Sequence, residues 1–162
     1  MTEVDIRTAH LAQALNRIQM HEEQMAHLLD LSQRAQYLSE QEVCNVVIDL
    51  AVKITNSRIG YLHMVDDDQD TVSLVAWNAE ALTYCSSAHV SHYPLTDAGI
   101  WADCARERRP VVHNDYQNMA GKKTCPEGHT HLIRHLSVPV LDGDKVLMIV
   151  GVGEGTSTRQ RS

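Results

Sequence analysis

The residues of this chain that are best suited to hold a small molecule lie between positions 77 and 129. Trp77 ends an apolar run, and His92 and Tyr93 come just before the helix-capping pair Thr96-Asp97. On a helix that begins there, residues three and four positions apart share a face. Apolar walls with a few polar groups are typical of sites for small organic ligands. We therefore predict a ligand-binding site made of eight residues: Trp77, His92, Tyr93, Gly99, Ile100, Trp101, Cys104 and His129.

Several of these residues also have a purely structural interpretation. Taken singly, Ile100, Trp101 and Cys104 fit plain packing in a core. For His92 and His129, structural hydrogen bonding is as good an interpretation as ligand contact. The segment His113-Asn114-Asp115 fits a hydrogen-bonded turn that holds the following loop better than it fits binding.

Metal or haem binding is an alternative that the cysteines and histidines raise. Soft ligands are available at Cys85, His92, Cys104, Cys125 and His129. None of them shows the tight Cys-x-x-Cys or His-x-x-x-His spacing that identifies a metal site. We therefore predict no metal ligands and leave the cofactor open, with a metal- or haem-binding redox sensor as an alternative function.

Motifs and charge narrow the functional class. The chain has no phosphate-binding Walker loop, no Gly-x-Ser-x-Gly and no His-Glu-x-x-His, and its paired carboxylates lie in the turn Asp66–Asp70. We therefore expect that it is not an enzyme. A formal charge of −7 disfavours nucleic acid and anionic membranes as partners. Since no signal peptide or membrane-spanning run is visible, we expect a cytoplasmic location without membrane insertion.

The elements that position these residues begin with a helix from Thr2 to Leu38, a stretch without Pro or Gly. Alternate spacings of four and three select a stripe in which six of eight residues are apolar: Val4, Thr8, Leu11, Leu15, Ile18, Glu22, Met25 and Leu29. This spacing indicates a coiled coil. We therefore predict a homodimer through this helix, the alternative being a helix that folds back on its own domain.

The rest of the chain alternates helices with strands. The capping box Ser39-Glu40-Gln41-Glu42 begins a second helix, and a capped helix is expected from Thr96-Asp97 to about Arg109. The other expected elements are strands 58–65 and 71–77, a short helix within 79–85, a strand at 110–114, a loop at 115–129, and strands 132–141 and 145–152. The hairpins at both ends of this order predict an antiparallel sheet and an α+β fold.

The chain from about Leu31 to Gly153 resembles a GAF domain. The motifs that carry the resemblance are Gly60-Tyr61-Leu62-His63, His92-Tyr93-Pro94-Leu95, Gly99-Ile100-Trp101-Ala102-Asp103, Arg108 to Tyr116, Pro126-Glu127-Gly128-His129, Val138-Pro139-Val140 and Val150-Gly151-Val152-Gly153. They are similar to the bacterial subgroup found beside PAS, histidine kinase, diguanylate cyclase or phosphodiesterase modules. The resemblance implies an antiparallel sheet with helices on one face and pocket-forming loops on the other, preceded here by the long N-terminal helix.

The resemblance also implies a function. We expect a small-molecule-sensing regulatory module of a bacterial signal-transduction protein, in two-component or cyclic-di-GMP signalling, that transmits its ligand state through the dimerising helix. The expected parts are residues 1–38 as the coiled-coil-like helix, 39–153 as the GAF domain and 154–162 as a flexible tail. A dimerisation module without a ligand is the structural alternative. GAF-type reductases of free methionine sulfoxide use cysteines, but no close matching cysteine pair is present.

Overall fold

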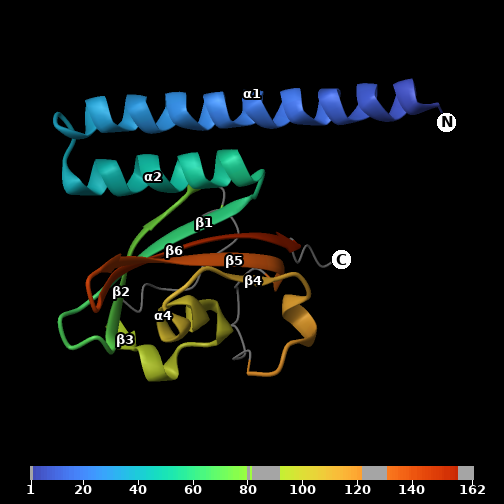
Figure 1. Cartoon of the computed structure of the whole chain (residues 1–162). Helices are drawn as coiled ribbons and strands as arrows, with labels where there is room; N and C mark the ends of the chain where they lie inside the picture. Colours follow the sequence, from blue (N-terminus) through green and yellow to red (C-terminus); the bar gives the residue numbers. More distant parts are fainter. Residues whose placement is uncertain (1, 80, 82–91, 122–130, 157–162) are drawn as a thin grey trace, which may run out of the picture. The chain divides into compact units, whose positions relative to one another are not determined.

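The computed structural model describes residues 2–79, 81, 92–121 and 131–156, and of residues 92, 93, 131 and 156 only the backbone. The chain divides into two units, Met1–Ser39 and Glu40–Ser162. Figure 1 shows the elements of each unit. None of the helices within the described residues is both long enough and apolar enough to span a bilayer.

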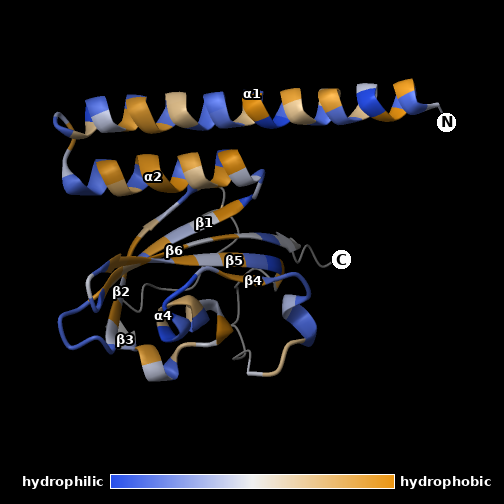
Figure 2. Ribbon diagram, viewed as in Figure 1, coloured by the Kyte–Doolittle hydropathy of each residue, from blue (hydrophilic) through white to orange (hydrophobic). Residues whose placement is uncertain are grey.

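The first unit is the helix α1, Glu3–Ala35. Its start is fixed by a capping box in which the Thr2 side chain accepts a hydrogen bond from the Asp5 amide and the Asp5 carboxylate accepts one from the Thr2 amide. The six apolar residues of the predicted stripe are 55–71% exposed. Figure 2 shows apolar positions recurring along the whole helix with polar positions between them. The long N-terminal helix is therefore confirmed.

The second unit is built on one antiparallel sheet. Its elements are α2 (Glu40–Thr55), β1 (Ile59–Val65), β2 (Thr71–Trp77), β3 (His92–Pro94), β4 (Val111–His113), β5 (His131–Asp142) and β6 (Lys145–Thr156). The six strands lie in the order β3-β2-β1-β6-β5-β4, and every neighbouring pair is antiparallel. The predicted α+β fold with an antiparallel sheet is confirmed.

Helix α2 covers one face of this sheet, where Ile48 packs on Leu62 and Ala76 (Figure 1). Gly60 lets the helix come close, because a Cβ atom there would lie 2.6 Å from a methyl carbon of Val52 and 2.7 Å from one of Ile48. The short spacing explains why strand β1 carries a glycine at its buried start. This apolar layer holds the central strands in place.

The opposite face is covered by three short helices that follow β3: η1 (Leu95–Asp97), η2 (Ile100–Ala102) and α4 (Asp103–Glu107). Figure 1 shows this segment on the side of the sheet away from α2. Its Ala102 and Cys104 are fully buried in a core with Val72 and Ile149. The site described below lies on this face.

One continuous helix from Thr96 to Arg109 was predicted, and this prediction is wrong. Ala98 and Gly99 are extended, with ψ angles of 145° and −167°, so the helical path breaks between η1 and η2. Arg108 adopts the left-handed conformation, at a φ of 54°, and ends α4. The arginines therefore do not line the end of one long helix, and each has its own partner.

Smaller differences concern strand ends and loops. Strand β3 was not expected, since the sequence before the first 3-10 helix has no alternating pattern, yet it pairs with β2 through Ser73 and Val72. Strand β6 extends to Thr156, four residues beyond the expected end, because β5 continues beside it. A third 3-10 helix, η3 (Tyr116–Asn118), lies in the expected loop. Most of the short helix expected within 79–85 lies outside the described residues.

Candidate functional site

Polar aromatic side chains are buried on the sheet face beneath η2 and α4. Tyr61 and His63 stand two apart on β1, so both point to this face. His113 on β4 is the direct cross-strand partner of His135 on β5. All four side chains are only 2–7% exposed. Because burying a polar ring costs free energy unless it finds partners, this cluster needs a physical explanation.

A glycine on the strand between them brings Tyr61 and His135 together. Tyr61 is paired with Gly151 on β6, and Gly151 with Ser137 on β5. A Cβ atom on Gly151 would collide with the ring of Tyr61. The missing side chain therefore lets this ring cross β6, and its hydroxyl lies 2.7 Å from Nε2 of His135.

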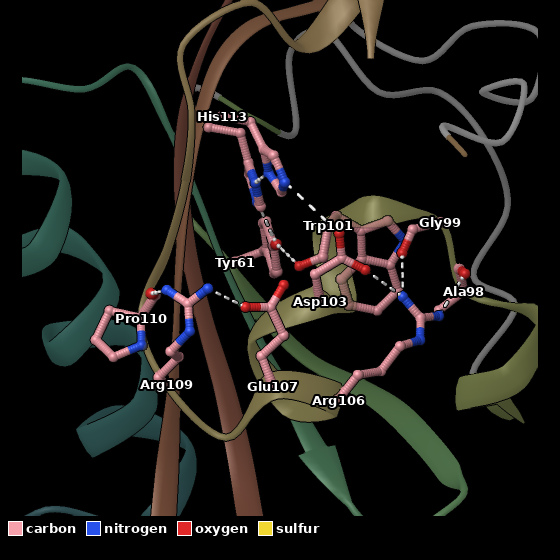
Figure 3. Close-up of polar contacts among 11 residues, drawn as sticks. Tyr61, Ala98, Gly99, Trp101, Asp103, Arg106, Glu107, Arg109, Pro110 and His113 are labelled. Atoms are coloured by element: carbon pink, nitrogen blue, oxygen red, sulfur yellow. Dashed lines mark hydrogen bonds and ion pairs between the residues drawn. The ribbon is translucent and has the colours of Figure 1, made fainter. Parts of the chain in front are cut away.

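From His135 the polar contacts continue toward the surface. Nδ1 of His135 lies 3.4 Å from Nδ1 of His113, with the two rings stacked at 13°. Nε2 of His113 lies 3.6 Å from Oδ2 of Asp103, the first residue of α4. Figure 3 shows His113 pointing toward Asp103 beside Tyr61 and Trp101. Polar contacts therefore run from the central strand β1 to α4, through Tyr61, His135, His113 and Asp103.

Arg106 ends this row of contacts and holds the backbone before α4 (Figure 3). Its Nη1 donates to Oδ1 of Asp103 at 2.7 Å and to the Gly99 carbonyl at 3.0 Å. Its Nη2 donates to the carbonyls of Leu95 at 2.8 Å and Ala98 at 2.6 Å. One guanidinium group therefore donates to three carbonyls of the broken helical segment, and we call these contacts the Arg106 clamp.

Trp101 covers the inner end of the cluster. Its ring stacks on His63 at 4.6 Å between centroids and meets Tyr61 edge to face at 5.8 Å. The Tyr61 hydroxyl lies 3.4 Å from the Trp101 carbonyl. Together with partly buried Trp77, Trp101 packs against the core that contains Cys104. The wall of the cluster is therefore aromatic and apolar.

Burial keeps the two innermost imidazoles uncharged. It lowers the pKa of His63 to about 4, and burial together with the neighbouring His113 lowers the pKa of His135 to about 3. Burial also raises the pKa of the Cys104 thiol, which the Ser137 hydroxyl opposes in part. At neutral pH this face therefore offers neutral hydrogen-bonding rings and no thiolate from Cys104.

The predicted site residues fare differently. Trp77, Trp101 and Cys104 meet in one core cluster. Ile100, which precedes Trp101 in the sequence, is also buried. Gly99 has a φ of −73°, and its carbonyl accepts a hydrogen bond from Arg106, so its observed contact is structural. His92 and Tyr93 lie on β3 with side chains outside the described residues, as does the whole of His129.

The sequence prediction missed Tyr61, His63, His135 and Asp103 as site residues. A signal for three of them was present, since His63 and His135 are polar residues within apolar strands and Tyr61 stands two positions before His63. His113 was assigned to a turn network with Asn114 and Asp115, whereas its ring faces Asp103 and His135. That role depends on cross-strand pairing, which no local pattern shows.

Within the described part of the chain, no three His, Cys, Asp or Glu residues lie close enough together to hold a metal ion. Of the five soft ligands considered for metal or haem, only Cys104 has a described side chain, and it is fully buried.

A sequence model of a family described as "GAF domain" matches residues 38–161. The Methyl sulfide methyltransferase-associated sensor of Methanosarcina acetivorans is 34% identical over 149 residues, which are 91% of this chain and 14% of that protein. The chain thus spans only a small part of this curated relative.

Solved structures share the fold at low sequence identity. The GAF domain of a phosphoenolpyruvate-protein phosphotransferase from Coxiella burnetii superposes with a TM-score of 0.67 and 15% identity, over 83% of this chain and 79% of that one. The free methionine-R-sulfoxide reductase of Neisseria meningitidis superposes with a TM-score of 0.58 and 11% identity, over 80% of this chain and 72% of that one.

Proposed function

Because the chain belongs to the GAF domain family, we propose that it is a sensor module that binds a small molecule on the sheet face beneath η2 and α4. The family relationship includes a protein named a sensor. The observation that carries the proposal is the cluster of buried, uncharged polar rings at Tyr61, His63 and His135 beside Trp101. We also propose that the module acts beside PAS, histidine kinase, diguanylate cyclase or phosphodiesterase modules in two-component or cyclic-di-GMP signalling.

A core that served only to hold the fold would favour apolar residues at these positions. Removing a hydroxyl and two imidazoles from water costs free energy, and apolar side chains of similar volume avoid that cost. Binding sites instead combine apolar walls with a few polar groups that fix the orientation of a ligand. Trp101 and Trp77 supply the walls, and the neutral imidazole of His63 supplies a polar group.

Native mass spectrometry of the purified protein tests this function. We expect a small molecule of constant mass to remain bound to the wild type and to be lost from Trp101→Ala. The control is Cys44→Ala, a change on α2 at the opposite face of the sheet, which retains the molecule. Absence of any bound molecule, together with no shift of the melting temperature in a metabolite screen, would favour the purely structural dimerisation module.

Signal output is proposed to run through α1, whose exposed apolar stripe fits pairing with a second copy of the chain. Leu11, Leu15 and Ile18 are 71%, 58% and 55% exposed and follow the heptad spacing of a coiled coil. Ligand binding biases such a helix pair only through a difference in affinity for two arrangements. The homodimer is tested by the α1 variants described in the Discussion.

We further propose that the chain binds without catalysing a reaction. The likeness to a free methionine-R-sulfoxide reductase is one of fold. Burial raises the pKa of both described cysteines, Cys44 and Cys104, which disfavours the thiolate that such chemistry needs. Incubation with free methionine sulfoxide and a dithiol is expected to give no methionine above a protein-free control. Turnover would overturn this part of the proposal.

A further inference from the structure

Trp101 covers the buried rings of the cluster but is itself only partly buried. Beneath it, Tyr61 and His63 are 7% and 6% exposed. The indole of Trp101 stacks on the His63 ring at 4.6 Å between centroids and meets Tyr61 edge to face. A ligand that contacts His63 from the side of η2 must therefore take the place that this indole fills.

The contacts of the indole also describe what can replace it. Its plane lies at 28° to the His63 ring and at 87° to the Tyr61 ring. A stack on one ring and an edge-to-face contact with another are the two arrangements that aromatic pairs prefer. A saturated ring is thicker and has no π-face, so it reproduces neither arrangement. The place over His63 therefore fits a flat aromatic ring system.

The backbone that carries Trp101 is held on both sides. Before Trp101, the Arg106 clamp binds three carbonyls of the segment. After it, Ala102 and Cys104 are fully buried in the core. Moving the whole segment would break the clamp and expose these two residues, whereas turning the Trp101 side chain breaks only the contacts of that side chain. Rotation of the side chain is therefore the opening that costs less free energy.

We propose that Trp101 is a gate, in the sense that its indole and the ring of a flat aromatic ligand compete for one place over His63. This inference rests on the proposed sensor function, because it names the class of ligand and the residue that admits it. Burial keeps His63 uncharged at neutral pH, with a pKa lowered to about 4, so stacking and not charge selects the ligand. The Arg106 clamp keeps the backbone of η2 in place while the side chain turns.

Hydrogen exchange at the ring carbon Cε1 of the histidines tests the gate in the wild-type full chain. NMR follows this exchange in deuterated water at several urea concentrations below the unfolding transition. A local opening exposes little surface and depends weakly on urea, whereas global unfolding depends steeply on it. We expect His63 to exchange with weak urea dependence, and buried His135 to exchange only through global unfolding. A His63 exchange rate that follows global unfolding would overturn the gate.

Two variants compare the gate with its surroundings. Trp101→Ala removes the indole and is expected to raise the His63 exchange rate by about tenfold or more. Leu95→Ala shortens another partly buried side chain of the same core and is expected to leave that rate within about twofold of the wild type. Equal acceleration in both variants would overturn the gate, because general loosening of the core would then explain it. Trp101→Leu takes the place of Trp101→Ala if the alanine variant does not fold.

The class of ligand is tested with indole, the ring of Trp101 itself, added to Trp101→Ala. We expect indole to slow the His63 exchange in a saturable way, since it stacks on the imidazole again. Cyclohexylmethanol, which carries a saturated ring, is expected to give no such protection. Absence of protection by indole, or equal protection by both compounds, would overturn the assignment of this place to an aromatic ligand.

The gate and the sensor function fail in different measurements. A bound molecule in the native mass spectrum, together with His63 exchange that follows global unfolding, would reject the gate and keep the sensor function. Weak urea dependence of His63 exchange and protection by indole support the gate, and they are measured without the natural ligand.

Discussion

At the scale of single residues, the unusual feature is a row of neutral imidazoles inside a small core. His63 and His135 lie on neighbouring parts of the same sheet face, and both are at most 6% exposed. Each stays uncharged because the surrounding apolar groups solvate an imidazolium poorly. The polar rings thus link the stability of the fold to pH, because the unfolded chain solvates the same rings freely.

Stability is expected to fall as the pH is lowered from 6.5. The folded pKa values of about 4 for His63 and about 3 for His135 lie below the ordinary value of 6.5, so the unfolded chain binds more protons between these limits. Each histidine then lowers the free energy of unfolding by about 1.4 kcal/mol per pH unit. Above pH 6.5 the two contribute no pH dependence. Urea unfolding at several pH values measures this slope.

Single histidine variants separate this effect from others. His63→Gln is expected to reduce the slope, because one buried titrating group is lost. His21→Gln removes an exposed histidine of α1 and is expected to leave the slope as it was. Equal slopes for wild type and His63→Gln would contradict the assignment.

Gly151 is expected to tolerate no side chain. In Gly151→Ala the new Cβ would overlap the Tyr61 ring, which must move and give up its contact with His135. Overpacking and the lost hydrogen bond together should lower the free energy of unfolding by about 2 to 4 kcal/mol. Gly143→Asn is the control, since a Cβ there meets no atom within 4 Å and Asn accepts its positive φ of 53°. Similar losses in both variants would argue against the packing explanation.

At the scale of elements, the segment from η1 to α4 depends on one side chain. The Leu95 and Gly99 carbonyls each accept a backbone hydrogen bond, from the Ala98 and Ala102 amides, and the Arg106 clamp adds a second donor to each of them and a donor to the Ala98 carbonyl. Lysine keeps the charge beside Asp103 but lacks the planar fork that reaches several acceptors. The clamp therefore depends on guanidinium geometry and not on charge alone.

Arg106→Lys is expected to lower the free energy of unfolding by about 1 to 3 kcal/mol, because three charged hydrogen bonds are weakened and the Leu95 and Gly99 carbonyls are left with their backbone donors alone. Arg108→Lys serves as the control, since Arg108 is exposed and donates to the Gly143 carbonyl at 3.3 Å, and this change is expected to cost well under about 1 kcal/mol. Urea unfolding of both variants gives the comparison. A harmless Arg106→Lys would show that the carbonyls find other donors.

Helix α1 also has an unusual property, because among the described residues its apolar stripe is exposed to solvent. We predict that Leu15→Asp combined with Ile18→Asp yields monomers, because two charges would enter the seam of a coiled coil. Light scattering measures the mass. Gln13→Asp with Asn16→Asp adds the same two charges away from the stripe and is expected to stay dimeric. A dimeric double variant of the stripe would refute the coiled-coil interface.

At the scale of the whole molecule, the chain consists of two units with different sources of stability. The unit Glu40–Ser162 contains the sheet and both core clusters. The unit Met1–Ser39 is one helix without a buried residue among those described, and isolated helices are marginally stable in water. Their independent stability can therefore be measured on separate fragments.

We expect residues 40–162 alone to unfold in one cooperative urea transition, because both faces of the sheet are packed within that unit. A peptide of residues 1–39 is expected to gain helicity as its concentration rises, since association covers the stripe. Circular dichroism follows both. A fragment 40–162 without a cooperative transition would show that the sheet needs the first unit.

Local patterns in the sequence were sufficient for the elements with strong periodicity. The stripe from Val4 to Leu29 predicted α1, and alternating apolar residues around the acidic turn predicted the hairpin of β1 and β2. That the sheet is antiparallel, and that the fold is α+β, followed from the hairpins expected at both ends of the domain. Such features depend on residues close together in the chain, which explains why sequence alone could determine them.

Tertiary structure decided the site. Tyr61 meets His135 only because β6 lies between β1 and β5 with Gly151 at the crossing, and His113 meets Asp103 only because β4 forms the edge beside α4. The break at Ala98 and Gly99 likewise depends on Arg106, seven residues beyond Gly99. Contacts between residues distant in the chain have no local pattern, since their free energy appears only when the sheet has assembled. That is why the sequence determined the frame of this protein, and only the packed sheet brought its buried polar groups together.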